Sequence, residues 1–505
     1  MKKTILLSLL WSFCISNTFC QPMSGNEIIK AANEQLDEGL TELMRFLEIP
    51  NIGSVEEDVA NNLKWCINRF QKLNFSTRVI TTEGAPLLFA EKTVTKDKKT
   101  ILFYLQIDGQ PVDNTEWDQP HPFSPVIKKK DVNGSWSMID RNTEKILDHE
   151  WRVFGRSASD SKGPAMAFIT ALDIFKQRSM QAEFNIKVIM DFQEELGSPT
   201  LASAVERHGD LLRADMVLIM DGTRHISNWP TLTYGARGIA TATIDIFGPK
   251  SPLHSGQYGN YAPNPVFEAS RFIASLKDEK GRVMIKGFYD GITLTETDKI
   301  ALNSLPENED SLKIRLGIAE SDQVGGSYQE SLQYPSLNIR GLRSAWVDKE
   351  VRTIIPDQVK IELDMRLVPE TPGERMINLL EEHLRIQGYH LVDSIPTDLE
   401  RRSYPKLASL RYRLGSQPFR TEMDSETGDF LNRAMQTVFG SKVVNMRTTG
   451  GSQPIAPFVR TLNVPAVSIR IPNPDNNIHA PNENLRVGNF LEGIMMCLAI
   501  LNEPL

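Results

Sequence analysis

Short apolar runs alternate with amphipathic segments along most of the chain. Four runs rich in Val, Ile, Leu, Phe and Met have the length of buried strands and lie at 101–105, 184–189, 216–220 and 467–471. Helical spacing of apolar residues predicts helices over 27–47 and 163–176, the second with Pro164 near its first turn. Continuous apolar strands between helices are typical of a sheet covered on both faces. This part of the sequence therefore predicts an α/β domain.

The pattern changes in the middle of the chain and then returns. Two segments, 239–247 and 359–367, alternate apolar and polar residues, which predicts strands with one wet face, and two others, 265–277 and 374–387, have helical spacing. The segment 278–335 is rich in charges and turns and has no clear assignment. We predict a mixed sheet covered by helices in 21–229 and 413–505, with a smaller α+β domain inserted at 230–412.

The first twenty residues have the features of an export signal. Lys2 and Lys3 precede an apolar run at 4–15, and small residues before Gln21 fit cleavage after Cys20. Lipidation of Cys20 is an alternative that the bulky Phe19 disfavours. A membrane anchor is another, but about a dozen apolar residues are too few to span a bilayer. We expect a periplasmic or secreted protein without a stable membrane span.

Composition and charge narrow the function classes. The sequence is 40% hydrophobic and 24% charged, as in soluble globular proteins, and 505 residues are too many for one core. With 64 acidic and 56 basic residues, a nucleic-acid surface is not expected. Outside the signal only Cys66 and Cys497 remain, both in apolar surroundings, so no disulfide framework is predicted.

Polar residues collect just past the carboxyl ends of the predicted strands, the edge where open α/β sheets bind ligands. They are Gln106 and Asp108 after the first strand, Asp191, Glu194 and Glu195 after the second, Asp221 after the third, and His479 after the fourth. Taken singly, each acid also fits a turn or a helix cap. Together they would repel one another without a cation, so the joint pattern predicts a metal site. Oxygen and imidazole ligands suit zinc, with manganese or cobalt as alternatives.

Four motifs contain most of these residues. They are Tyr104-Leu-Gln-Ile-Asp108-Gly-Gln-Pro111, Gly155-Arg-Ser-Ala-Ser-Asp160-Ser-Lys-Gly163, Gln193-Glu194-Glu195-Leu-Gly197-Ser198 and His479-Ala-Pro-Asn-Glu483. With them, the sequence from about residue 28 to its end resembles the M20 metallopeptidases, a group of dipeptidases, carboxypeptidases and deacetylases. The resemblance implies a metal-hydrolase domain with an inserted lid or dimerisation domain.

The resemblance also implies roles for the individual residues. Asp160 would bridge two zinc ions, Glu195 and His479 would bind one of them, Asp221 would bind the other, and Glu194 would be the general base. The chain departs from the family at Gln106, where the family has a histidine ligand that Asp108 orients. A neutral amide oxygen is a poorer zinc ligand than imidazole. We therefore expect one metal site to be weak, altered in preference or empty.

Three further features lie beyond the metal ligands. Pro252-Leu-His254-Ser-Gly256 is similar to the segment whose histidine stabilises the developing oxyanion in the partner subunit, which implies a homodimer. Arg366 and the loop Gly450-Gly451-Ser452 resemble residues that hold a substrate carboxylate. Taken alone, His254 also fits a surface loop and Arg366 a solvated strand face.

The expected function is hydrolysis of amide bonds in dipeptides or small peptides with a free carboxylate. The first alternative is an N-acyl-amino-acid deacylase of the same family. The second is a metal-poor binding protein, an interpretation that Gln106 favours and Glu194 opposes.

Overall fold

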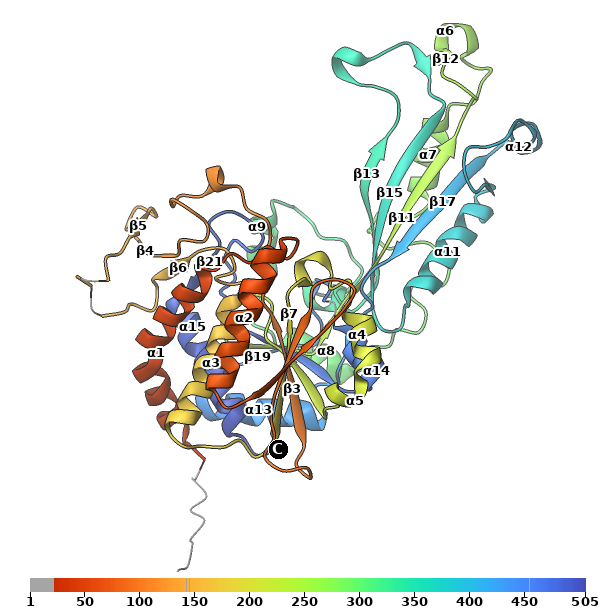
Figure 1. Ribbon diagram of the computed structural model, residues 1–505. Helices are drawn as coiled ribbons and strands as arrows, with labels where there is room; N and C mark the ends of the chain where they lie inside the picture. The colour runs from red at the N-terminus through yellow and green to blue at the C-terminus, as the bar shows by residue number, and fades with distance from the viewer. Residues whose placement is uncertain (1–21, 142, 145, 454) are drawn as a thin grey trace, which may run out of the picture.

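The computed structural model describes residues 22–141, 143–144, 146–453 and 455–505, so the predicted signal at 1–20 lies outside the described residues. A rounded body contains both ends of the described chain, and an elongated arm projects from it (Figure 1). No helix in these ranges combines the length and the apolar composition needed to cross a membrane.

An eight-stranded mixed sheet forms the centre of the body. Its order is β1 (Ser76–Ile80), β2 (Leu87–Lys92), β7 (Asn185–Asp191), β3 (Thr100–Gln106), β8 (Met216–Ile219), β20 (Ala466–Arg470), β9 (Thr231–Thr233) and β19 (Val444–Met446). Strands β7, β3, β8 and β20 run parallel to one another. They are the four apolar runs of the sequence, displaced by at most two residues at any end.

Helices cover both faces of this sheet, which explains the continuous apolar strands. Ile101, Phe103 and Leu105 of β3 face the larger core, whereas Leu102 and Tyr104 face the smaller one. The larger core includes side chains of α1 (Gly25–Leu47), α2 (Glu56–Lys72), α3 (Lys162–Gln177), α13 (Glu426–Phe439) and α15 (Val487–Asn502). The smaller core includes side chains of α4 (Leu201–Arg207), α5 (Gly209–Leu212) and α14 (Ala456–Leu462). Cys66 of α2 and Cys497 of α15 are buried, as the sequence predicts, and neither forms a disulfide with another described residue.

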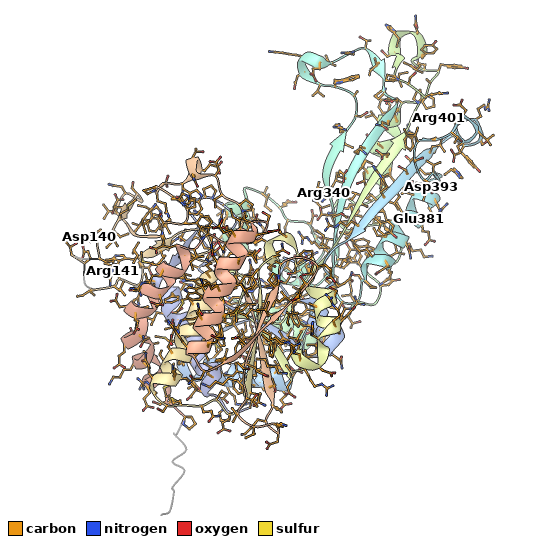
Figure 2. The ribbon with its side chains drawn as sticks, viewed as in Figure 1. Asp140, Arg141, Arg340, Glu381, Asp393 and Arg401 are labelled. Carbon is orange, nitrogen blue, oxygen red and sulfur yellow. The ribbon has the colours of Figure 1, made fainter. Side chains whose placement is uncertain are left out.

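The arm is a five-stranded sheet with helices on one face only. Its order is β13 (Ser336–Arg343), β15 (Gln358–Leu367), β11 (Gly238–Phe247), β17 (Leu407–Leu414) and β16 (His390–Leu391). The apolar residues of β15 pack with α7 (Pro265–Ala274) and α11 (Gly373–Ile386), and its alternate residues are polar and only partly buried. Figure 2 places Arg340 of β13, Glu381 of α11 and Arg401 of α12 (Asp398–Ser403) on this arm. The predicted α/β body with an inserted α+β unit is confirmed.

The inserted stretch contributes to the body as well as to the arm. Strand β9 belongs to the eight-stranded sheet, and β10 (Gly235–Ala236) pairs with β18 (Phe419–Arg420). The segment without a sequence assignment forms α8 (Glu296–Asn303), α9 (Glu309–Leu316) and α10 (Tyr328–Ser331). It is fixed to the body by an ion pair between Arg447 and Asp298 and by a contact of 2.9 Å between His225 Nε2 and Glu307 Oε1. The predicted domain boundaries stay predictions.

A small four-stranded sheet joins two loops that are distant in sequence. Its order is β21 (Asn484–Arg486), β6 (Arg152–Phe154), β4 (Val126–Lys130) and β5 (Trp136–Met138). Strand β6 leads into the loop that carries Asp160, and β21 follows the loop that carries His479. Because β6 and β21 pair antiparallel, with Asn484 opposite Phe154, these two loops lie side by side.

Candidate metal centre

The candidate site forms where parallel strands of the body sheet end together. Gln106 at the end of β3 is opposite Asp191 at the end of β7, and β8 ends beside them. Asp108, Glu194 and Asp221 therefore leave the sheet at one edge, as the sequence predicts. Asp191 itself accepts hydrogen bonds from the Tyr104 hydroxyl (3.0 Å) and the Gln193 backbone (2.9 Å), so it holds the loop together.

Asp160, Glu195 and His479 form a three-residue cluster. His479 Nε2 lies 2.9 Å from Asp160 Oδ2 and 3.2 Å from Glu195 Oε2, and one ligand atom of each residue lies within 4.8 Å of the other two. Glu195 Oε1 is buried and has no hydrogen-bond partner among the described residues. A buried anionic oxygen without a partner is costly. Two carboxylates and an imidazole, together with this unpartnered carboxylate oxygen, therefore fit a divalent cation.

Asp221 lies next to this cluster but outside it. The hydroxyl of Ser161 is 3.0 Å from both Asp160 Oδ1 and Asp221 Oδ1. The other oxygen of Asp221 accepts a hydrogen bond of 3.0 Å from the side-chain amide of Gln453. Gln106 is 1% exposed, and its Nε2 has no partner among the described residues.

Asp108 positions the two neighbouring glutamates. Its carboxylate accepts hydrogen bonds from the backbone N–H of Glu194 (2.9 Å) and of Glu195 (3.0 Å), at the start of the short helix η2 (Glu194–Leu196). Burial and the charges of Asp221 and Asp160 hold the pKa of Glu194 well above its usual range. A raised pKa suits a carboxylate that accepts a proton and returns it near neutral pH.

Glu483 organises the loop that carries Asp160, a role that the sequence alone did not assign. It is fully buried, and one of its oxygens accepts hydrogen bonds from the backbone N–H groups of Ser159 and Asp160, both 2.9 Å long. The other oxygen accepts from Ser157 N (3.1 Å) and from Arg156 Nη1 (2.7 Å). In the sequence, the feature that could have suggested this role was the position of Glu483 at the end of the His479 motif.

The predicted substrate residues meet where the arm joins the body. Arg366 Nη1 of β15 donates a hydrogen bond of 3.0 Å to Ser452 Oγ, and Gly451 beside it is exposed. Ser452 precedes Gln453, and Gln453 contacts Asp221. The pair of Arg366 and Ser452 is therefore connected through the next residue to the candidate metal centre.

His254 is not near the cluster within one chain. It ends the short strand β12 (Leu253–His254), which lies at the far tip of the arm (Figure 1). Its Nδ1 accepts a hydrogen bond of 3.1 Å from the backbone of Gly256.

Comparison with known proteins identifies the family. The sequence matches the peptidase family M20/M25/M40 over residues 102–503. The chain belongs to this family. The expected resemblance is confirmed, and the chain is a metal-dependent peptidase of the M20 type.

The M20 relatives match most of the chain. The Cys-Gly metallodipeptidase of Schizosaccharomyces pombe is 25% identical over 500 residues, which cover 95% of this chain and 98% of that protein. The human Beta-Ala-His dipeptidase is 26% identical over 426 residues, which cover 83% and 77%. The structure of an M20 family metallo-carboxypeptidase from Sulfolobus solfataricus has a TM-score of 0.73 and 26% identity, covering 92% of this chain and 99% of that one.

When a chelator has removed the metal, the stability of the folded protein is expected to depend on pH. Hydrogen bonds to Asp160 and Glu195 raise the pKa of His479 to about 10, and burial and the charge of Asp191 raise the pKa of Asp108 to about 8. Both groups hold their protons more tightly when folded, so their stabilisation is complete below their unfolded pKa values and is lost as pH rises through the folded ones. The apparent Tm of chelated protein should fall from pH 6.5 to pH 10 in thermal unfolding scans. A Tm that rises over this interval would contradict the raised pKa values of His479 and Asp108.

Proposed function

We propose that this chain is a zinc dipeptidase that hydrolyses small peptides with a free carboxylate. The observation that carries the proposal is the cluster of Asp160, Glu195 and His479 beside Glu194, with Arg366 and Ser452 at the adjoining body–arm junction. Dipeptidase names among the relatives support the same substrate class. A substrate of this kind places one amide bond near its terminal carboxylate, which suits a cation centre close to a guanidinium group.

Zinc would be held by Asp160, Glu195 and His479. A bound divalent ion supplies Lewis acidity, which polarises an amide carbonyl and lowers the pKa of water. The second ion that the resemblance implies would have Asp160, Asp221 and Gln106 as ligands, a set without imidazole.

The side chains of the protein perform the proton transfers and hold the substrate. Glu194 takes the proton of the attacking water and delivers it to the nitrogen of the leaving amine. Asp108 fixes the position of Glu194 through the backbone hydrogen bond described above. Arg366 binds the substrate carboxylate with its planar guanidinium group, and Ser452 orients Arg366.

Hydrolysis of a peptide panel tests the proposal. Dipeptides with a free carboxylate should be cleaved by the zinc-loaded protein, and a chelator should abolish the activity. Preferential hydrolysis of N-acyl amino acids would favour the deacylase instead. Inactivity on both substrate classes with zinc, manganese or cobalt would favour a binding protein.

Replacing Arg366 with Ala is expected to raise KM for dipeptides roughly 10- to 100-fold, because a hydrogen bond to a charged group contributes about 1.5–3 kcal/mol. The variant Arg343→Ala, which removes an exposed arginine of the neighbouring strand β13, is the matched control. Steady-state kinetics on a dipeptide and on its C-terminal amide separate the effects. An equal loss on both substrates would show that Arg366 does not bind the carboxylate.

Homodimer formation and a role for His254 across the dimer are part of the proposal. The position of His254 at the arm tip requires a second chain if this side chain is to reach a metal centre. His254→Ala should lower kcat more than it raises KM, and mixing it with Glu194→Gln should restore activity, since one site of a mixed dimer has both groups. No recovery in mixtures that form dimers would exclude this role.

Export is proposed from the N-terminal signal pattern alone. The N-terminal sequence of protein recovered outside the cytoplasm should begin at Gln21, and retention of residues 1–20 would contradict cleavage.

A further inference from the structure

Both oxygens of Asp221 have side-chain partners, as do those of Asp160, but neither partner of Asp221 is itself a candidate metal ligand. Ser161 is at one oxygen and Gln453 at the other, each at 3.0 Å. Gln453 is itself fixed, since the hydroxyl of the buried Ser468 donates to its Oε1 at 3.1 Å. This bond directs the NH₂ group of Gln453 to Asp221. A cation that bound Asp221 at that oxygen would have to displace the amide.

A cationic side chain also lies beside Asp221. Arg470 is buried at the end of β20, and its Nε donates a hydrogen bond of 2.8 Å to Thr233 Oγ1. A Cβ added to Gly222 would lie 2.1 Å from Arg470 Nη1, so the guanidinium packs directly against the residue that follows Asp221. Burial lowers the pKa of Arg470, and the charge of Asp221 opposes that change. The protein therefore supplies its own positive charge on this side of the centre.

Gln106 completes the contrast between the two sides. It offers zinc a neutral amide oxygen, whereas structural and catalytic zinc sites use anionic ligands and imidazole. The Asp221 side therefore combines a carboxylate that already accepts a hydrogen bond from Gln453 with an uncharged side chain. The His479 side combines an imidazole with the unpartnered buried oxygen of Glu195.

We propose that each chain binds a single zinc ion, at Asp160, Glu195 and His479, and that Asp221 acts as a hydrogen-bond acceptor for Gln453 in place of a second ion. Gln453 then connects the centre to the substrate loop, because it follows Ser452 directly. This inference rests on the zinc site of the proposed function but not on its substrate.

Metal counting tests the proposal without an activity measurement. Chelated protein is dialysed against zinc, or against zinc with manganese, and the metal content per chain is measured by mass spectrometry. Wild-type protein and Asp221→Asn should each bind one zinc ion, whereas His479→Ala should bind almost none. Asp210→Asn, which changes a fully exposed carboxylate, is the control for zinc adsorbed on the surface. Two ions per wild-type chain, of zinc or with manganese, would overturn the proposal, as would loss of zinc in Asp221→Asn that remains folded by circular dichroism.

Gln106→His gives the reciprocal test. It restores an imidazole at the end of β3 and should raise the zinc content to two per chain, and adding Asp221→Asn should return it to one. An unchanged zinc content in Gln106→His would show that Gln106 is not the reason why the chain binds a single ion. If the protein hydrolyses dipeptides with two bound ions, this inference is overturned and the proposed function stands. If it binds one ion and does not hydrolyse them, the proposed function is overturned and this inference stands.

Discussion

Replacing Glu194 with Gln is expected to lower kcat by roughly 100- to 10,000-fold, the usual contribution of general acid–base catalysis. The amide keeps the shape of the side chain but cannot take a proton from water. The change leaves Asp160, Glu195 and His479 in place, so the zinc content should stay the same. Because Asp108 holds Glu194 through its backbone, the local fold should also be retained.

Rapid-mixing or steady-state kinetics together with a metal count measure this effect. Glu206→Gln is a suitable control, since this glutamate lies on the exposed side of α4, after the same strand. A variant that keeps more than about a tenth of the wild-type kcat would exclude Glu194 as the general base. A variant that loses its zinc would assign Glu194 to binding instead of proton transfer.

Replacing Glu483 with Ala is expected to cause the largest loss of stability. The substitution leaves Arg156 buried without its ionic partner, and breaking such a pair costs about 3–5 kcal/mol. It also removes the acceptor that holds the backbone at Ser159 and Asp160, so the zinc site should weaken together with the fold.

Urea unfolding and zinc titration of the same variant separate these two effects. Added zinc should recover part of the lost stability, because an ion that binds only the folded state favours it. Asp210→Ala is the control, and little change is expected there because its partner Arg213 is also exposed. Unchanged unfolding of Glu483→Ala would show that the Asp160 loop is held by other contacts.

The body sheet could be predicted because local pattern and burial agree. Strand β3 is buried on both faces, so its sequence is a continuous apolar run, and the residues after it reach the candidate metal centre by the geometry of parallel strands. The alternating pattern of β15 likewise follows from helices on one face only. The motifs around Asp160 and His479 were visible in sequence because each is short and contiguous.

Long-range pairing explains what the sequence did not predict. Glu483 acts on residues more than 320 positions earlier, and Gln453 acts on Asp221 across 232 positions. Such contacts leave no periodicity in either segment. Helices α8 and α9 are short, and α9 has no buried residue, so their packing depends on isolated pairs such as Asp298 with Arg447. Composition alone could not assign that segment.

Under the proposed function, the contact between Arg366 and Ser452 links substrate binding to the orientation of the arm. Arg366 belongs to the arm sheet, whereas Ser452 belongs to a loop of the body. A carboxylate bound at this contact would bridge the arm and the body, and by linkage any change in their relative orientation that separates the two groups would weaken its affinity.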